Sequence, residues 1–108
     1  MTDASIVLGY VDPAYFAGGS LQLQPELSRR VIQERIAGPL GLTVEQAALG
    51  IHRVVNANMA EGIRLVSARR GIDPRRFALL AFGGAAGLHI TEVARQLAYA
   101  MGMPLHRF

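Results

Sequence analysis

Residues 43–71 decide the fold, and they read T-V-E-Q-A-A-L-G-I-H-R-V-V-N-A-N-M-A-E-G-I-R-L-V-S-A-R-R-G. Apolar side chains recur at helical spacing through about six turns of this stretch. Thr43 stands three residues before Gln46, which is the spacing of a capping box at a helix N-terminus. Gly71 is placed to adopt the left-handed conformation that ends a helix. The sequence therefore predicts one long amphipathic helix over residues 44–70.

Beyond this helix, the chain reads F-A-L-L-A-F-G-G-A-A-G-L-H over residues 77–89. An unbroken apolar run, residues 77–82, is typical of a strand buried on both faces. The pair Gly83-Gly84 closes the run, and a helix is expected over residues 85–101. Such a turn suits a phosphate ligand, because glycines permit close approach and N–H groups at a helix start attract anions. It matches neither a Walker loop nor a dinucleotide-binding fingerprint, so a tight connection without a ligand is the favoured interpretation on local grounds.

Two further elements are expected upstream of the long helix. Residues 4–8 read A-S-I-V-L, a short, partly β-branched apolar run that predicts a buried strand. Pro25 suits the first position of a helix, and apolar residues at helical spacing carry that helix to residue 37. Gly38-Pro39 is expected to end it, because proline disfavours helical geometry in the residue before it. The predicted fold class is α/β and mostly helical.

These elements do not close a core by themselves. A buried strand at 77–82 needs strands on both edges, and the chain offers mainly the short run at 4–8. The long helix at 44–70 also has a wider apolar face than the other elements can cover. We therefore expect residues 1–108 to form a single partial domain, either a fragment of a larger enzyme or a chain that buries its excess apolar surface against a second copy.

The composition is that of a folded protein, with 51% apolar and 18% charged residues. Its net charge of +3 and pI of about 10.2 raise the question of a nucleic-acid partner. The 11 basic residues are all arginine and are scattered along the chain, so we expect a solvated surface and no nucleic acid partner. No apolar run reaches about 18 residues without a charge, so no membrane span is expected. Without cysteine there are no disulfides or zinc–sulfur sites, and a cytoplasmic location is the default expectation.

Few side chains offer chemistry on their own. His89 lies near the start of the last predicted helix, but no acid nearby in the sequence is an evident partner, so packing or capping is the simpler interpretation. Asn58 lies seven residues after Ile51, so we expect its amide on the apolar face of the long helix, where it must find hydrogen bonds. Asn56 is expected to face solvent or a domain contact. No metal site, no Ser/His/Asp triad and no catalytic residue is predicted.

Four blocks of the sequence resemble the hydantoinase/oxoprolinase A-type family. Residues 2–19 open with T-D-A-S-I-V-L-G and resemble the family's T-D-A-N-x-x-L-G. Residues 50–59 are similar to G-x-x-R-V-x-N-x-x-M, and residues 63–77 to I-R-x-x-S-x-x-R-G-x-D-P-x-x-F. Residues 81–89 resemble A-F-G-G-A-G-P-x-H. The blocks stand in the family's order and cover essentially the whole chain.

The resemblance implies a fragment of the second lobe of an actin-like ATPase fold, as in sugar kinases and heat-shock chaperones. The implied parent reaction is ATP-driven opening of a cyclic amide, as in ATP-dependent hydantoinase and 5-oxoprolinase. Two alternatives stay open: an acetone carboxylase-type subunit, and a non-enzymatic helical dimerisation module. The implied partners are the remainder of the parent polypeptide and a B-type hydantoinase subunit or domain. Further copies of the protein are expected from the apolar surface that the chain leaves uncovered. Because actin-like folds grip ATP between two lobes, the isolated chain is expected to be inactive and to bind no nucleotide.

The same resemblance implies a site for ATP with Mg²⁺ in the parent enzyme. Two departures from the family pattern bear on it. Ser5 stands where asparagine is usual, which weakens any role for that side chain, and Ala86-Gly87 replaces the common Gly-Pro, which changes the stiffness of the turn. The implied cofactor-binding residues are Gly83, Gly84, Ala85, Gly87 and His89, and Asp3 and Asn58 also match family positions.

Overall fold

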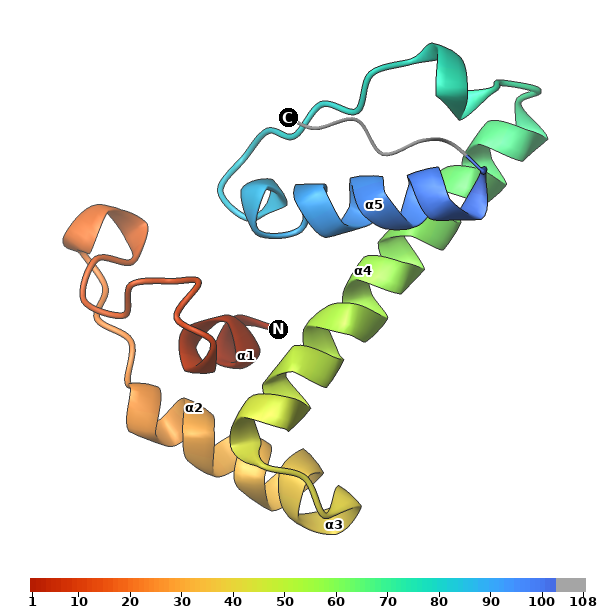
Figure 1. Cartoon of the computed structure of the whole chain (residues 1–108). Helices are drawn as coiled ribbons and strands as arrows, with labels where there is room; N and C mark the ends of the chain where they lie inside the picture. The colour runs from red at the N-terminus through yellow and green to blue at the C-terminus, as the bar shows by residue number, and fades with distance from the viewer. Residues whose placement is uncertain (103–108) are drawn as a thin grey trace. The chain divides into compact units, whose positions relative to one another are not determined.

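The computed structural model describes residues 1–102, and within that range it is helical and contains no β-strand. The chain divides into two compact units: the first spans Met1–Arg53, and the second begins at Val54. None of the helices in the described range is both long and apolar enough to cross a membrane. In chain order (Figure 1) the elements are α1 (Thr2–Val7), the 3₁₀ turn η1 (Ala17–Gly19), α2 (Pro25–Ile32), the π-helical turn η2 (Gln33–Ala37), α3 (Gly38–Leu40), α4 (Val44–Arg69), the 3₁₀ turns η3 (Pro74–Arg76) and η4 (Ala86–Leu88), and α5 (Ile90–Ala100).

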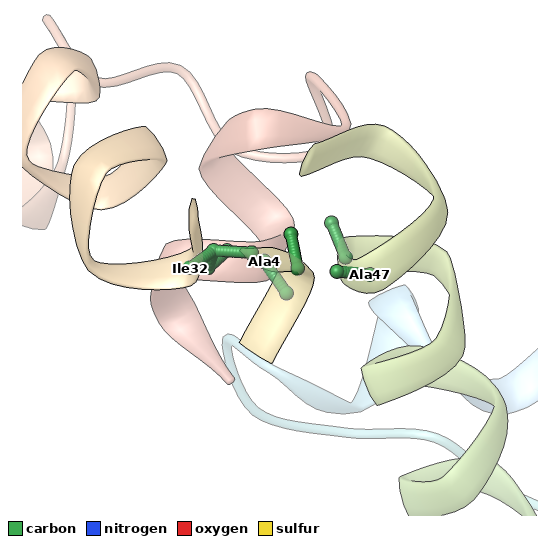
Figure 2. Packing of buried hydrophobic residues seen from close by; sticks show 5 residues of the cluster. Ala4, Ile32 and Ala47 are labelled. Carbon is green, nitrogen blue, oxygen red and sulfur yellow. The ribbon is translucent and has the colours of Figure 1, made fainter. Parts of the chain in front are cut away.

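The core of the first unit contains four alanines and one isoleucine. Ala4, Ile32, Ala37, Ala47 and Ala48 are all at most 2% exposed and form one cluster. Figure 2 shows the side chains of Ala4, Ile32 and Ala47 directed toward one another from α1, α2 and α4. Alanine lets helix backbones approach closely, so this packing holds α1, which at six residues is too short to be stable alone.

The predicted strand at residues 4–8 is wrong, because α1 covers Thr2–Val7. A short apolar run reads alike as a buried strand or a buried helical turn, and periodicity cannot separate the two over so few residues. A strand also needs a neighbour for its backbone N–H and C=O groups, whereas a helix satisfies them internally. No partner strand exists within residues 1–102, and the helical form buries Ala4 and Ile6 locally.

The helix predicted over 25–37 is present but does not end there. α2 passes through the π-helical turn η2 into α3, and the helical path stops only at Gly41, whose φ is +68°. Pro39 follows closely on the π-helical turn η2, where the regular α-helical hydrogen-bond pattern is already interrupted. The prediction that Gly38-Pro39 ends the helix is therefore wrong.

The long helix predicted over 44–70 is confirmed, since α4 runs uninterrupted from Val44 to Arg69 (Figure 1). Its capping box forms in full: the Gln46 N–H donates to Thr43 Oγ1 at 3.1 Å, and the Thr43 N–H donates to Gln46 Oε1 at 2.9 Å. Gly71 takes φ +65°, and its N–H donates to the carbonyl of Ala68 as the helix ends. Both ends of this helix were thus encoded locally.

The second unit packs α5 against the C-terminal part of α4. Val93 and Leu97 of α5 are buried with Ala60 of α4, and Ile63 packs against them. A helix was expected over 85–101, but the regular α-helix α5 covers only Ile90–Ala100, and the 3₁₀ turn η4 comes before it. Val93 and Leu97 are four residues apart, so they lie on one face of α5.

The buried strand predicted at residues 77–82 is wrong. Within residues 1–102 this segment pairs with no strand, and Phe77, Leu80 and Phe82 are 67%, 79% and 82% exposed. An unbroken apolar run indicates a strand only when neighbouring strands cover it, and none is available in the described part of the chain. The segment is therefore an exposed apolar connection between the two helices of the second unit.

Candidate functional site

The glycine turn after this connection is open and exposed. Gly83 adopts φ +87°, a backbone conformation that residues with a side chain rarely adopt. A Cβ built at Gly83, Gly84 or Gly87 would meet no heavy atom within 4 Å. Ala85 is exposed as well. The turn that the sequence singled out therefore presents its backbone outward, with space for a ligand to approach it closely.

His89 anchors the far end of this turn. Its side chain is 7% exposed, and its Nδ1 lies 2.7 Å from Oδ1 of Asn56 on α4. Its N–H donates to the carbonyl of Ala86 at 3.1 Å, and its own carbonyl accepts from the Val93 N–H at 3.0 Å. His89 is thus tied to η4, to α5 and, through Asn56, to α4, and the packing role that the sequence favoured is the one observed.

The two asparagines of α4 are placed opposite to expectation. Asn56 is buried, at 5% exposure, and Asn58 is exposed. The prediction counted seven residues from Ile51, which is itself only half-buried. The buried positions instead include Ala48, His52, Asn56 and Ala60, spaced four residues apart. A signal for Asn56 did exist in the sequence, because it stands at the asparagine of the G-x-x-R-V-x-N-x-x-M block.

Asp3 lies in the first unit, in the first turn of α1. Its Oδ1 accepts a hydrogen bond from the Ser28 hydroxyl of α2 at 2.7 Å. Ser28 is buried, so this bond satisfies its hydroxyl and fixes α1 on α2. The geometry of Asp3 is therefore that of a residue that joins two helices.

A buried polar pair in the first unit escaped the sequence-based prediction. Ser5 Oγ lies 3.0 Å from His52 Nε2, and the two residues are 2% and 3% exposed. The ring of Tyr10 packs edge-to-face on His52, with 5.0 Å between centroids. A serine nucleophile needs access to substrate, and this degree of burial gives the pair a structural role. Ser5 fills the position where the family pattern has asparagine, and it too is a hydrogen-bonding side chain.

Asp73 organises the connection that follows α4. Its Oδ1 accepts from the Arg75 N–H at 3.0 Å, and its two oxygens face the Arg75 guanidinium. The hydrogen bond from that guanidinium holds the pKa of Asp73 below its usual range, and the carboxylate in turn raises the pKa of Arg75. Both groups are at the surface, so this pair shapes the 3₁₀ turn η3 and is not a buried reactive site.

A shallow groove of about 530 Å³ runs between α4 and α5 in the second unit. Small side chains, Ala57, Ala60 and Ala100, contribute to its lining. Its charged lining residues form two ion pairs, Glu61 with Arg64 and Glu92 with Arg95. None of the sequence-predicted site residues lines this groove. Within residues 1–102, no three His, Asp or Glu side chains gather closely enough to hold a metal ion.

The sequence matches a known family along nearly its whole length. Residues 1–103 match the family described as hydantoinase/oxoprolinase. The chain belongs to this family. Among the relatives of this hydantoinase/oxoprolinase chain, caprolactamase subunit alpha of Pseudomonas jessenii is 46% identical over 90% of the chain, and acetophenone carboxylase gamma subunit of Aromatoleum aromaticum is 38% identical over 96% of it.

Two solved structures are similar to the chain in fold. The chain matches the crystal structure of ATP-dependent caprolactamase from Pseudomonas jessenii with a TM-score of 0.79 and 47% identity. It matches nucleotide-free acetone carboxylase, solved to study ATP-dependent acetone carboxylation, with a TM-score of 0.82 and 33% identity. Each alignment covers 89% of this chain. The chain spans only 14% of the length of these relatives, so the family member corresponds to a small part of them.

Proposed function

We propose that this chain is part of an ATP-dependent enzyme that hydrolyses a cyclic amide. The observation that carries the proposal is the level of identity. Identity to the caprolactamase is 46–47%, whereas identity to the acetophenone and acetone carboxylases is 33–38%. This difference in identity favours a relative of the caprolactamase, which opens a cyclic amide, over a relative of the two carboxylases.

The second candidate is a subunit that carboxylates a ketone. Its support is the fold comparison, in which the acetone carboxylase gives the TM-score of 0.82 against 0.79 for the caprolactamase. The two scores are nearly equal, so backbone similarity does not outweigh the difference in identity. We do not propose a stand-alone dimerisation module, because the chain aligns with only 14% of much longer enzymes.

Within the parent enzyme, the glycine turn is proposed to face the nucleotide. The residues fit such a ligand: Gly83, Gly84 and Ala85 are exposed, and no neighbouring side chain occupies the space beside either glycine. Gly87 continues the turn, and His89 fixes its end. When bound, ATP supplies a phosphoryl group that activates the ring carbonyl, so that water can displace the ring nitrogen. The described residues do not fit a Mg²⁺ site of their own, because no acidic cluster lies among them.

The exposed apolar side chains of the chain indicate that other parts of the parent enzyme cover it. We propose that the chain belongs to the second lobe of an actin-like ATPase fold and that the remainder of the parent polypeptide covers residues 77–82. The exposure of Leu80 at 79% and of Phe82 at 82% supports such cover, because large apolar groups gain by leaving water. We also propose that the parent enzyme binds a B-type hydantoinase subunit, associates with further copies of itself and is located in the cytoplasm.

The proposed activity is tested with the full-length protein that carries this sequence. We expect ATP hydrolysis to rise when caprolactam, hydantoin or 5-oxoproline is added, with release of the ring-opened amino acid or carbamoyl product. Acetone or acetophenone with bicarbonate is expected to cause no such rise. Phosphate release and mass spectrometry of the products report both reactions, and a response to ketone with bicarbonate alone would transfer support to the second candidate.

The proposed role of the turn is tested by Gly84→Val in the same full-length protein. Gly84 has open space beside it and no left-handed φ, so valine should leave the fold intact while blocking close approach to the backbone. We expect the Kd for ATP, measured by calorimetry, to rise about tenfold or more, which corresponds to about 1.4 kcal/mol. Gly62→Val is the matched control, because Gly62 also has open space and no left-handed φ. Equal ATP affinity in the two variants would show that the turn does not contact the nucleotide.

A further inference from the structure

The glycine turn has little of its own to hold it in place. Gly83 and Gly84 are exposed, and a Cβ built at either would meet no heavy atom within 4 Å. Residues 77–82 before them are exposed except for the half-buried Ala81, and they form no strand within residues 1–102. A flexible backbone loses entropy when it closes on a ligand, so a turn that must bind tightly has to be fixed from elsewhere. The fixing point must therefore lie after the turn.

His89 is the first buried residue after the turn, and it is the first in a row of buried residues that continues along α5. His89, directly before α5, and Val93 and Leu97 on α5 are spaced four residues apart and are all at most 9% exposed. On α4, Asn56 stands four residues before Ala60 in the same way. The apolar members, Ala60, Val93 and Leu97, form one cluster, and the polar members meet in the 2.7 Å contact at the end next to the turn.

The hydrogen bond between Asn56 and His89 fixes the orientation of the His89 ring, which apolar packing alone does not. Apolar contacts tolerate small rotations and shifts, because burial is non-directional, whereas a hydrogen bond requires one distance and angle. An amide oxygen only accepts, so Oδ1 of Asn56 facing Nδ1 of His89 requires that Nδ1 carry a proton. Asn56 thereby selects both the orientation of the ring and its Nδ1–H form.

We propose that Asn56, and not Asn58, is the α4 asparagine that serves the nucleotide, and that it acts as a positioning residue through His89. The Asn56–His89 bond fixes residue 89, whose N–H is bonded to Ala86, and so holds the turn Gly83–Ala85 in its ligand-ready form. The inference rests on the proposed nucleotide role of that turn. Asn58 is exposed on the same helix and takes no part.

The test compares Asn56→Leu, Asn56→Asp and Asn58→Leu in the full-length protein. Leucine has nearly the shape of asparagine but cannot accept a hydrogen bond, so we expect the Kd for ATP to rise about tenfold or more in Asn56→Leu. Aspartate keeps the acceptor, so Asn56→Asp should bind ATP within about threefold of the unchanged protein. Asn58→Leu should bind ATP as the unchanged protein does. A melting temperature is measured for each variant, and affinity is compared well below the lowest of them.

A purely structural role would give a different result. Asn56→Leu would then melt at a lower temperature but keep its ATP affinity, and that outcome overturns the inference. Weaker binding in Asn58→Leu than in Asn56→Leu also overturns it.

The ring itself provides a readout that does not depend on the leucine variant folding. Nitrogen-15 spectra of the His89 imidazole in the unchanged protein should show the Nδ1–H form, with Asn56→Asp retaining it. The Nε2–H form in the unchanged protein overturns the inference.

The Gly84→Val variant separates this inference from the proposal on which it rests. If Gly84→Val weakens ATP binding and Asn56→Leu does not, the turn binds nucleotide and the positioning role is wrong. If neither variant weakens binding, both the nucleotide site and the positioning role are wrong.

Discussion

Replacing Ile32 by alanine is expected to lower the free energy of unfolding of the first unit by about 2–5 kcal/mol. Ile32 is 2% exposed and is the only large side chain in a cluster whose other buried members are Ala4, Ala37, Ala47 and Ala48. Truncating it leaves a cavity beside the buried alanines, and the half-buried side chains that pack against the cluster (Val7, Leu8, Ile36, Val44 and Ile51) can fill it only in part. The 108-residue chain is unfolded with urea, and NMR amide signals from α1, α2 and the first half of α4 follow the transition.

Val31→Ala is the matched control for this experiment. Val31 is the preceding residue on α2 and is also β-branched, but it is 43% exposed. We expect its replacement to change the free energy of unfolding by about 0.5 kcal/mol or less. If both substitutions destabilise the first unit equally, Ile32 is not the centre of its core.

Val93→Asp is expected to destabilise the second unit by about 3–5 kcal/mol, because it places an unpaired carboxylate in an apolar contact. Val93 is 2% exposed and packs with Ala60 and Leu97. Within the described residues, this one small cluster is the buried apolar contact between α5 and α4, so a charge inside it should detach the helix. Amide hydrogen exchange of residues 90–100 measures this directly, and we expect their protection to fall while that of the first unit is retained.

Thr91→Asp places the same charge two residues earlier on α5, at an exposed position. A carboxylate in the first turn of a helix is mildly favourable, so the exchange protection of α5 should stay the same or increase slightly. Loss of protection in Thr91→Asp as well would mean that charge alone, and not burial, releases the helix.

The features that the sequence predicted correctly are those with local causes. The capping pair Thr43 and Gln46 and the left-handed Gly71 set the ends of α4, and all three act within a few residues of themselves. The open glycine turn was likewise visible, because Gly83-Gly84 requires no distant partner to adopt its backbone conformation.

The errors share another cause, which is dependence on partners far along the chain. Residues 4–8 and 77–82 both have strand-like composition, but a strand needs hydrogen-bonding neighbours, and the described chain provides none. The first run forms a helix against α2, and the second remains exposed.

The buried contact between Asn56 and His89 was predicted only in part, for the same reason. His89 was recognised, but its partner lies 33 residues away on α4, and spacing from Ile51 selected Asn58 in place of Asn56. Helical spacing shows which residues share a face, but the neighbour of that face determines which side is buried. Only the packing of α5 distinguishes the two asparagines.

The sequence by itself determined the family, the long helix, the glycine turn and the excess of apolar surface, because motifs, caps and composition are properties of neighbouring residues. Tertiary structure alone decided that Ala4–Val7 is helical, that residues 77–82 stay unpaired, and that Asn56 holds His89. These outcomes depend on the contacts between helices, whose free energies exceed the local preferences of so few residues.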